Sequence, residues 1–92
     1  MSHTTEILYR RKKSIVFQQV DGLVHILDEK KDAIVTLNKT ATHLWKCLSH
    51  PMSSKQLVKH ITSIYTIDSH TATEDVGVFL KDMMKLGFLS TS

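Results

Sequence analysis

The side chains of this sequence that could carry metal or nucleophilic chemistry are its histidines and its single cysteine. Metal-binding histidines recur at fixed spacings such as His-x-x-x-His, and a nucleophilic cysteine needs a base beside it. No two of the six histidines have such a spacing: they are His3, His25, His43, His50, His60 and His70. Cys47 borders an apolar helical stripe and is interpreted as a small, half-buried apolar residue. The sequence therefore predicts no catalytic residue, no metal site and no cofactor.

The three glycines form no phosphate-binding loop, and one of them lacks a local explanation. Gly22 fits a tight turn and Gly87 fits the end of a helix, where positive φ angles are needed. Gly77 lies inside a predicted helix, where glycine costs about 1 kcal/mol relative to alanine. It shares one helical flank with Lys81 and Met84, and this flank could hold an extended peptide with acidic and apolar residues. Close packing against a neighbouring helix is the alternative explanation.

Length and composition indicate one small domain. The chain has 92 residues, of which 41% are hydrophobic, and a chain of this size buries about 60–65% of its unfolded surface. The single cysteine excludes an intramolecular disulfide. The N-terminus lacks the apolar core of a signal peptide, and no apolar run is long enough to span a bilayer. We therefore expect a cytoplasmic protein without a membrane partner.

The net charge of +3 owes much to one basic cluster, Arg10 to Lys13. The cluster precedes the first patterned run, so residues 1–13 are expected to form a flexible basic segment ahead of a domain spanning residues 14–90. Such a cluster could hold nucleic acid phosphates or an acidic peptide. The simpler interpretation is a solvated terminus.

The first half of the chain has the alternation of β-strands. Residues 15–20 and 23–28 flank Asp21-Gly22, a pair that favours a type I′ turn and therefore a hairpin. Residues 33–37 follow a charged link and are expected to pair antiparallel with the second strand. With turns of two and four residues, the core face of the sheet collects Phe17, Val24, Ile26, Val35 and Leu37. The opposite face collects Gln18, His25 and Thr36, and an apolar group that a partner could cover: Val16, Leu27 and Ile34.

The second half of the chain has the periodicity of helices. Asn38 is expected to cap a first helix that buries Ala41, Leu44, Trp45 and Leu48. Pro51 prevents its continuation, and Ser53 with Gln56 forms a capping box for a second helix over about residues 54–65. Met52 is expected to pack against the start of that helix, which buries Leu57, Val58, Ile61 and Ile64.

A third helix is expected to begin between Asp68 and Thr71, with Glu74 placed to complete a capping box from Thr71. Its apolar stripe is Ala72, Val76, Phe79, Leu80 and Met83. Gly87 supplies a left-handed stop, after which residues 88–89 fold back onto the core. The predicted fold class is α+β, with a three-stranded antiparallel sheet followed by three helices in a winged-helix-like arrangement.

The sequence resembles the PqqD-like family, whose members are precursor-peptide recognition elements of ribosomal peptide biosynthesis. The resemblance covers about residues 15–89 and depends mainly on LNKTATHLW at positions 37–45 and on GFL at positions 87–89. It implies a non-catalytic domain that captures the leader segment of a precursor peptide and presents it to a modifying enzyme, such as a radical SAM protein or a leader peptidase. The charged link over residues 28–32 departs from the proline or glycine often found in the family's turn.

The resemblance also implies where the peptide binds. The leader would add as a strand to the edge of the third strand, in a groove facing the third helix, because an edge strand offers unpaired N–H and C=O groups. The implied edge consists of Ala33, Ile34, Val35, Thr36 and Leu37. The helix wall, about residues 73–85, contributes the candidates Gly77, Val78, Lys81, Met84 and Lys85, of which only some can line the groove. Trp45 and Phe79 are assigned to the core, so that their mutation should unfold the protein.

Two other functions are weighed against peptide capture. A winged helix that binds nucleic acid needs a cationic recognition helix, but the third helix offers Lys81 and Lys85 against Glu74, Asp75 and Asp82. Nucleic acid therefore ranks well below a peptide as a partner. A homodimer or accessory subunit could instead use the apolar group around Ile34.

Overall fold

A computed structural model describes residues 6–91 of the chain, so that His3 and its neighbours in the first five residues lie outside the described part. In chain order the elements are β1 (Tyr9–Arg11), β2 (Phe17–Val20), β3 (Leu23–Asp28), β4 (Ala33–Thr36), α1 (Lys39–Cys47), α2 (Ser54–Ile64), α3 (Ser69–Lys85) and β5 (Leu89–Thr91). Strands β2, β3 and β4 form one antiparallel sheet in that order, and the three helices follow it. The predicted α+β class is confirmed.

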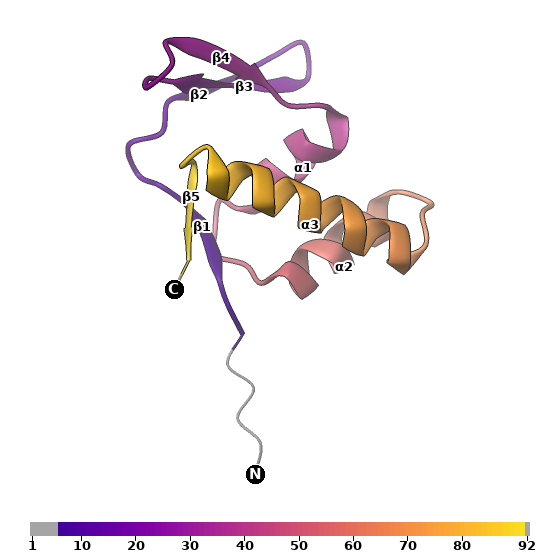
Figure 1. Ribbon diagram of the computed structural model, residues 1–92. Coiled ribbons are helices and arrows are strands. Elements are labelled where there is room, and N and C mark those ends of the chain that lie inside the picture. Colours follow the sequence, from indigo (N-terminus) through magenta and orange to yellow (C-terminus); the bar gives the residue numbers. More distant parts are fainter. Residues whose placement is uncertain (1–5, 92) are drawn as a thin grey trace.

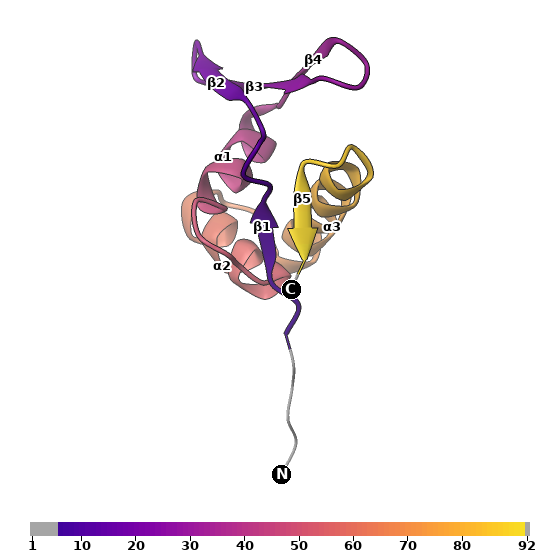
Figure 2. The ribbon, with the colours of Figure 1, turned by 90° about the vertical axis from the view of Figure 1, so that its left-hand side faces the viewer.

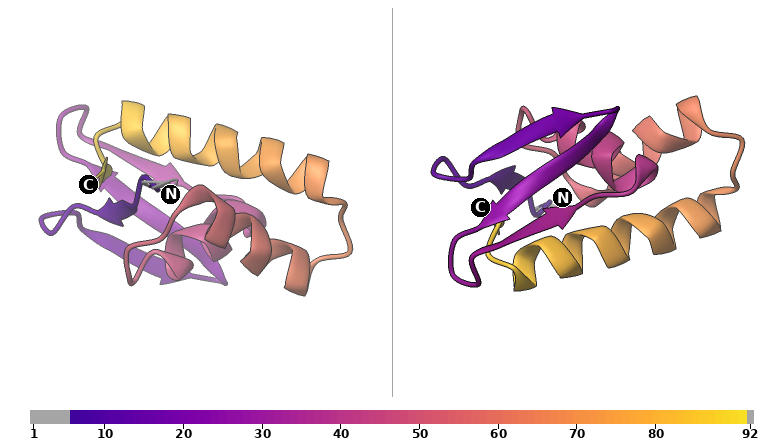
Figure 3. Two further views of the ribbon diagram at one scale, coloured as in Figure 1. Left: turned by 90° about the horizontal axis from the view of Figure 1, so that it is seen from below. Right: turned by 90° about the horizontal axis from the view of Figure 1, so that it is seen from above.

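The sheet and the helices form two layers (Figure 1). The β2-β3-β4 sheet lies over the helices, and Figure 2 shows α1 and α3 on either side of the short strands β1 and β5. Seen from above, α3 runs along the β4 side of the sheet (Figure 3). The core between the layers is apolar, and its largest fully buried side chains are Trp45, Ile26, Leu44, Leu57, Ile61, Leu89, Val24 and Val76. None of the helices within residues 6–91 combines the length and the apolar character that crossing a membrane requires.

The hairpin and its register agree with the sequence. Asp21 and Gly22 have φ angles of 53° and 82°, as a type I′ turn requires. Phe17 lies opposite Ile26, which lies opposite Val35, so these three residues share the predicted core face. On the other face Gln18, His25 and Thr36 are aligned. The charged link before β4 closes without glycine because Asp32 itself adopts a φ of 49°.

The helix boundaries also follow the predicted caps. The side chain of Asn38 accepts a hydrogen bond from Ala41 N, and Ser53 with Gln56 completes the capping box of α2. Asp68 caps α3, but Glu74 pairs with His70 and not with the cap. The five predicted apolar residues of α3 are all buried. The prediction that Ile64 is buried is also wrong: this residue, the last of α2, is 54% exposed, whereas Ile61 is 0% exposed.

A buried hydroxyl joins the sheet to α1. Thr42 is 5% exposed, and its Oγ1 accepts a hydrogen bond from Val24 N (3.0 Å) and donates one to Leu37 O (3.3 Å). Leu37 N in turn donates to Val24 O (2.8 Å). The Thr42 hydroxyl thus takes the place of a direct β3–β4 hydrogen bond from Val24 N to Leu37 O, and it fixes the angle at which β4 passes into α1.

The N-terminal segment requires a correction. Residues 9–11, expected to be loose, form β1, which pairs antiparallel with β5. Arg11 is the last residue of β1, and two aromatic rings hold its side chain. Its guanidinium carbon lies 4.9 Å from the Phe17 ring centroid and 5.5 Å from that of Trp45. These contacts anchor part of the basic cluster to the core. The division of the chain at residue 14 remains a prediction.

Candidate functional site

The outer edge of β4 carries backbone groups that point away from the sheet. In an antiparallel pair, hydrogen-bonded and non-hydrogen-bonded residues alternate. Leu27 N donates to Val16 O on the β2 side, so its opposite residue, Ile34, makes no ladder bond to β3. The same alternation applies two residues later at Thr36. The N–H and C=O groups of Ile34 and Thr36 therefore face the open edge of the three-stranded sheet.

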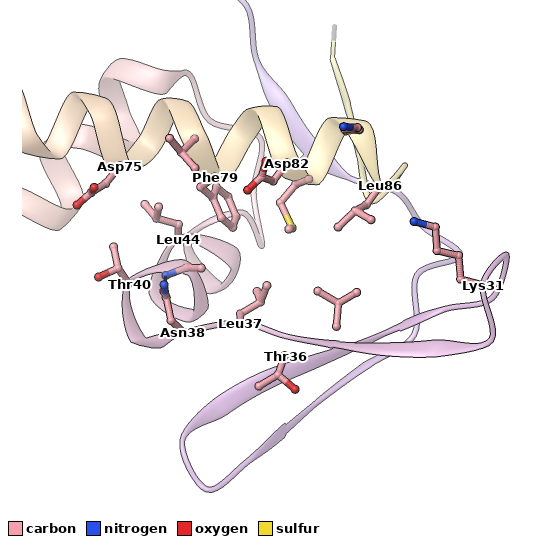
Figure 4. A pocket seen from close by; sticks show the side chains of 15 residues that line it. Lys31, Thr36, Leu37, Asn38, Thr40, Leu44, Asp75, Phe79, Asp82 and Leu86 are labelled. Atoms are coloured by element: carbon pink, nitrogen blue, oxygen red, sulfur yellow. Dashed lines mark hydrogen bonds between the residues drawn. The ribbon is translucent and has the colours of Figure 1, made fainter.

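A groove runs beside this edge, and we call it the β4–α3 groove (Figure 4). It has a volume of ≈ 640 Å³ and lies between β4, the start of α1 and one flank of α3. Its lining residues are Lys31, Val35, Thr36, Leu37, Asn38, Thr40, Ala41, Leu44, Asp75, Val78, Phe79, Asp82, Met83, Lys85 and Leu86. The floor is thus apolar, and one long wall is a strand edge.

The charged side chains along this groove are unevenly placed, and Asp82, about one turn before Lys85 on α3, lies between the two ends of the groove (Figure 4). Lys31 lies at the end where β4 begins, near Leu86, whereas Asp75 lies at the other end, near Thr40 (Figure 4). Two more lysines approach the basic end, since a Cβ on Gly87 would be 3.9 Å from the Nζ atoms of Lys12 and Lys30. Lys12 does not line the groove, but its backbone N–H is bonded to Phe88 O (3.1 Å), which holds this part of the N-terminal segment beside the end of α3.

The structure separates the predicted site residues into three sets. Val35, Thr36, Leu37, Val78 and Lys85 line the β4–α3 groove. Ala33 and Ile34 belong to β4 but do not line it, and the Ile34 side chain is 60% exposed on the opposite face of the sheet. The remaining residues lie on the far flank of α3, apart from β4: Gly77, Lys81 and Met84.

These last three residues line a second hollow, which we call the α2–α3 groove. It has a volume of ≈ 460 Å³, and its lining residues are Tyr9, Ser54, Lys55, Val58, Thr73, Val76, Gly77, Leu80, Lys81 and Met84. The two grooves share no lining residue. The sequence missed Asp75 and Asp82 as groove residues, although their spacing of seven places them on the flank of Val78.

The environments of Cys47 and His43 bear on catalysis and metal binding. Burial raises the pKa of the Cys47 thiol, which disfavours the reactive thiolate. Burial, followed by the nearby His60 and Lys46, lowers the pKa of His43. Within residues 6–91 no three His, Cys, Asp or Glu side chains gather closely enough to hold a metal ion. The groove offers binding surface, and its chemistry is that of backbone groups and apolar contacts.

Comparison with known families agrees with this geometry. The family described as coenzyme PQQ synthesis protein D (PqqD) matches residues 24–89, well over half of the chain. The chain belongs to the PqqD family. The match contains β4, all three helices and all of β3 except Leu23, and therefore both walls of the β4–α3 groove. The resemblance seen in the sequence is confirmed.

Two solved structures share the fold of this PqqD-family protein. One is TbiB1 in complex with the TbiA(beta) leader peptide, with a TM-score of 0.78 and 20% identity over 88% of this chain and 94% of that chain. The other is lasso peptide synthetase B1 complexed with the leader peptide, with a TM-score of 0.74 and 23% identity over 89% of this chain and 96% of that chain. No curated protein matches the chain. At these identities the likeness concerns the fold.

Proposed function

We propose that this protein binds the leader segment of a ribosomally made precursor peptide in the β4–α3 groove and presents it to a modifying enzyme. The leader adds as a fourth strand along β4. The observation that carries the proposal is the open backbone of Ile34 and Thr36 beside a groove walled by α3. Membership of the PqqD family and the fold shared with two leader-bound structures support the choice of ligand.

Strand addition explains how one groove can hold a peptide with little demand on its sequence. The open N–H and C=O groups of β4 bind any extended backbone, and alternate side chains of the added strand point into the groove. There they meet Val78 and Phe79 on α3. The protein needs no catalytic group for this role, because the chemistry is performed by the enzyme that receives the leader.

The geometry of strand pairing favours one direction for the bound leader. Antiparallel pairing is slightly more stable per residue than parallel pairing, so the leader runs from the Asn38 end of β4 towards its start. The C-terminal part of the bound strand then reaches Lys31 near Leu86, which follows Lys85 in the chain, and its N-terminal part reaches Asp75. We expect an acidic residue in the C-terminal part of the bound leader segment.

Proline at position 34 tests strand addition. The Ile34→Pro change removes an N–H that points to the open edge and leaves the β3–β4 ladder intact. Loss of one hydrogen bond and the clash of the ring with the added strand should weaken binding of a fluorescent leader peptide at least about tenfold, or about 1.4 kcal/mol. Fluorescence anisotropy measures this affinity with leaders of precursors encoded beside the gene.

Gln19→Pro is the matched control. Val24 directs its C=O towards β4, so Gln19, opposite Val24, points its N–H to the outer edge of β2. This edge belongs to the same sheet but borders neither groove. Equal loss of affinity in both variants, or none in Ile34→Pro, would count against strand addition to β4.

A further inference from the structure

The α2–α3 groove is a second surface that leader binding does not use. It lies between α2, α3 and Tyr9 of β1, on the flank of α3 that faces away from β4. Because the two grooves share no lining residue, both can be occupied at once. A module that presents a leader needs such a surface, since the enzyme must contact the module without displacing the peptide.

Gly77 has no structural reason to be glycine. It lies in the middle of α3 without a positive φ angle, and a Cβ built on it would have no atom of residues 6–91 within 4 Å. Neither the backbone nor the packing of this chain therefore requires glycine, which destabilises helix interiors relative to alanine. Close packing against a neighbouring helix, the alternative drawn from the sequence, is excluded. The turn of α3 at Gly77, which carries no side chain there, leaves space for a segment of another protein.

The lining of this groove defines the chemistry of that chain. Val58, Leu80 and Met84 give it an apolar surface, and the Met84 side chain is 39% exposed. Lys55 and Lys81 are charged residues of the lining, and none of the carboxylates within residues 6–91 lines the groove with them. The complementary partner presents apolar side chains bordered by Asp or Glu. The β4–α3 groove differs, because it contains both lysines and aspartates.

The backbone around the α2–α3 groove determines the shape of the partner. Two of its walls are helices, which have no free edge. The strand residue in its lining, Tyr9, is bonded on one side to Met52 (Tyr9 N to Met52 O, 2.8 Å) and faces Thr91 of β5 on the other. An added strand would find no N–H or C=O groups to pair with. A third helix can instead pack its ridges into the space between α2 and α3.

We infer that the α2–α3 groove docks an amphipathic helix of the modifying enzyme, with carboxylates beside its apolar face and its closest approach at Gly77. This inference rests on the proposed function for the identity of the partner, but it concerns a different surface. The enzyme bound at this groove and the leader bound at β4 lie on opposite flanks of one helix, so α3 holds them at a fixed separation.

The test compares two leucine substitutions on α3. Gly77→Leu fills the bare turn, whereas Glu74→Leu adds the same side chain at an exposed position that borders neither groove. Biolayer interferometry measures association with the purified radical SAM protein or leader peptidase encoded beside the gene. Gly77→Leu should weaken association at least tenfold and leave leader affinity within twofold, and Glu74→Leu, which also removes a carboxylate, should weaken neither. Thermal unfolding verifies that both variants are folded.

A second pair of variants tests the charge. Lys81→Glu should weaken association with the enzyme about threefold to tenfold, more at low salt than at high salt. Lys59→Glu makes the same change of net charge on an exposed part of α2 outside both grooves and should have little effect. Hydrogen exchange on the enzyme should show one protected helix bordered by Asp or Glu.

Each other outcome overturns the inference. The inference fails if Gly77→Leu binds the enzyme as well as the parent does, or if the parent does not bind the enzyme at all. It also fails if the protected segment of the enzyme is a strand or is basic. A parent homodimer that Gly77→Leu dissociates in light scattering would assign the groove to a second copy of this chain. Failure of the proposed function has a different signature: the leader does not bind the parent, while enzyme association still depends on Gly77.

Discussion

Helix α3 presents different chemistry on its two flanks. The flank that faces β4 carries Asp75, Val78 and Lys85, and the wall opposite is a strand with open backbone groups. The other flank carries Gly77 and Met84, and the wall opposite is another helix. The first flank is suited to an added strand and the second to an added helix. One amphipathic helix can therefore serve two partners if its buried stripe separates two surfaces of different backbone character.

The largest predicted effect is a loss of fold stability, which would remove both grooves together. Trp45 is 0% exposed and contacts the rings of Phe17 and Phe88 with centroid distances of 5.4 and 6.4 Å. Trp45→Ala should destabilise the fold by about 3–5 kcal/mol, a large share of the 5–15 kcal/mol that holds a small domain together. Chemical denaturation with circular dichroism measures the loss. A Trp45→Ala variant of near-parental stability that lost only leader binding would show that Trp45 acts in recognition and not in the core.

The next largest effect should concern leader binding on the β4 flank of α3, together with a smaller loss of stability. Thr42→Val keeps the volume of the side chain but leaves Val24 N without the hydroxyl that accepts its hydrogen bond. The expected cost is about 1–3 kcal/mol of stability, together with weaker leader binding because β4 loses its fixed angle to α1. Denaturant titration and anisotropy measure the two effects.

Thr62→Val is the control for Thr42→Val. The Thr62 hydroxyl donates only to helix carbonyls of Val58 and Lys59, so its removal should cost much less. Thr42→Val with unchanged leader affinity would argue that the groove does not depend on the strand-to-helix junction.

A charge reversal on each flank sharpens the comparison. Lys85 lines the β4–α3 groove and Lys81 the α2–α3 groove, so Lys85→Glu and Lys81→Glu make the same change of net charge on one helix. Lys85→Glu should weaken binding of an acidic leader about threefold to fivefold, or about 0.6–1 kcal/mol, and Lys81→Glu should not. The difference should shrink in high salt. Equal effects would mean that the leader responds to net charge alone.

The smallest effect concerns pH and should leave both flanks intact. The pKa of His43 lies below its ordinary value of 6.5, so the unfolded chain binds more protons as the pH falls through 6.5. The stability that neutral His43 provides is present above pH 6.5 and is lost below it. The melting temperature should fall by a few degrees between pH 7 and pH 5.5, and less in His43→Gln. An equal fall in both proteins would assign the effect to other groups.

The sequence was most informative where local chemistry decides the structure. Asp21-Gly22 determines its own turn, Asn38 and Ser53 cap the helices that follow them, and Gly87 ends α3 with a φ of 80°. Each of these depends on atoms within a few residues. The sheet register could be predicted for the same reason, since two short turns fix which residues align.

The failures concern contacts that are distant in the sequence. Strand β1 has three residues and pairs with β5 at the opposite end of the chain, so neither has a local pattern that predicts it. The phase of α3 relative to β4 could not be predicted either. Residues at steps of 100° about a helix axis change flank within two positions, and therefore Gly77 and Val78 face different grooves.

Amide hydrogen exchange of the protein with and without its leader peptide tests strand addition most directly. If the leader pairs with β4, the amides of Ile34 and Thr36 gain protection, whereas that of Gln19 on the outer edge of β2 keeps its rate. Unchanged exchange at Ile34 and Thr36 in a saturated complex, with protection at β2 or along the α2–α3 groove, would contradict the account.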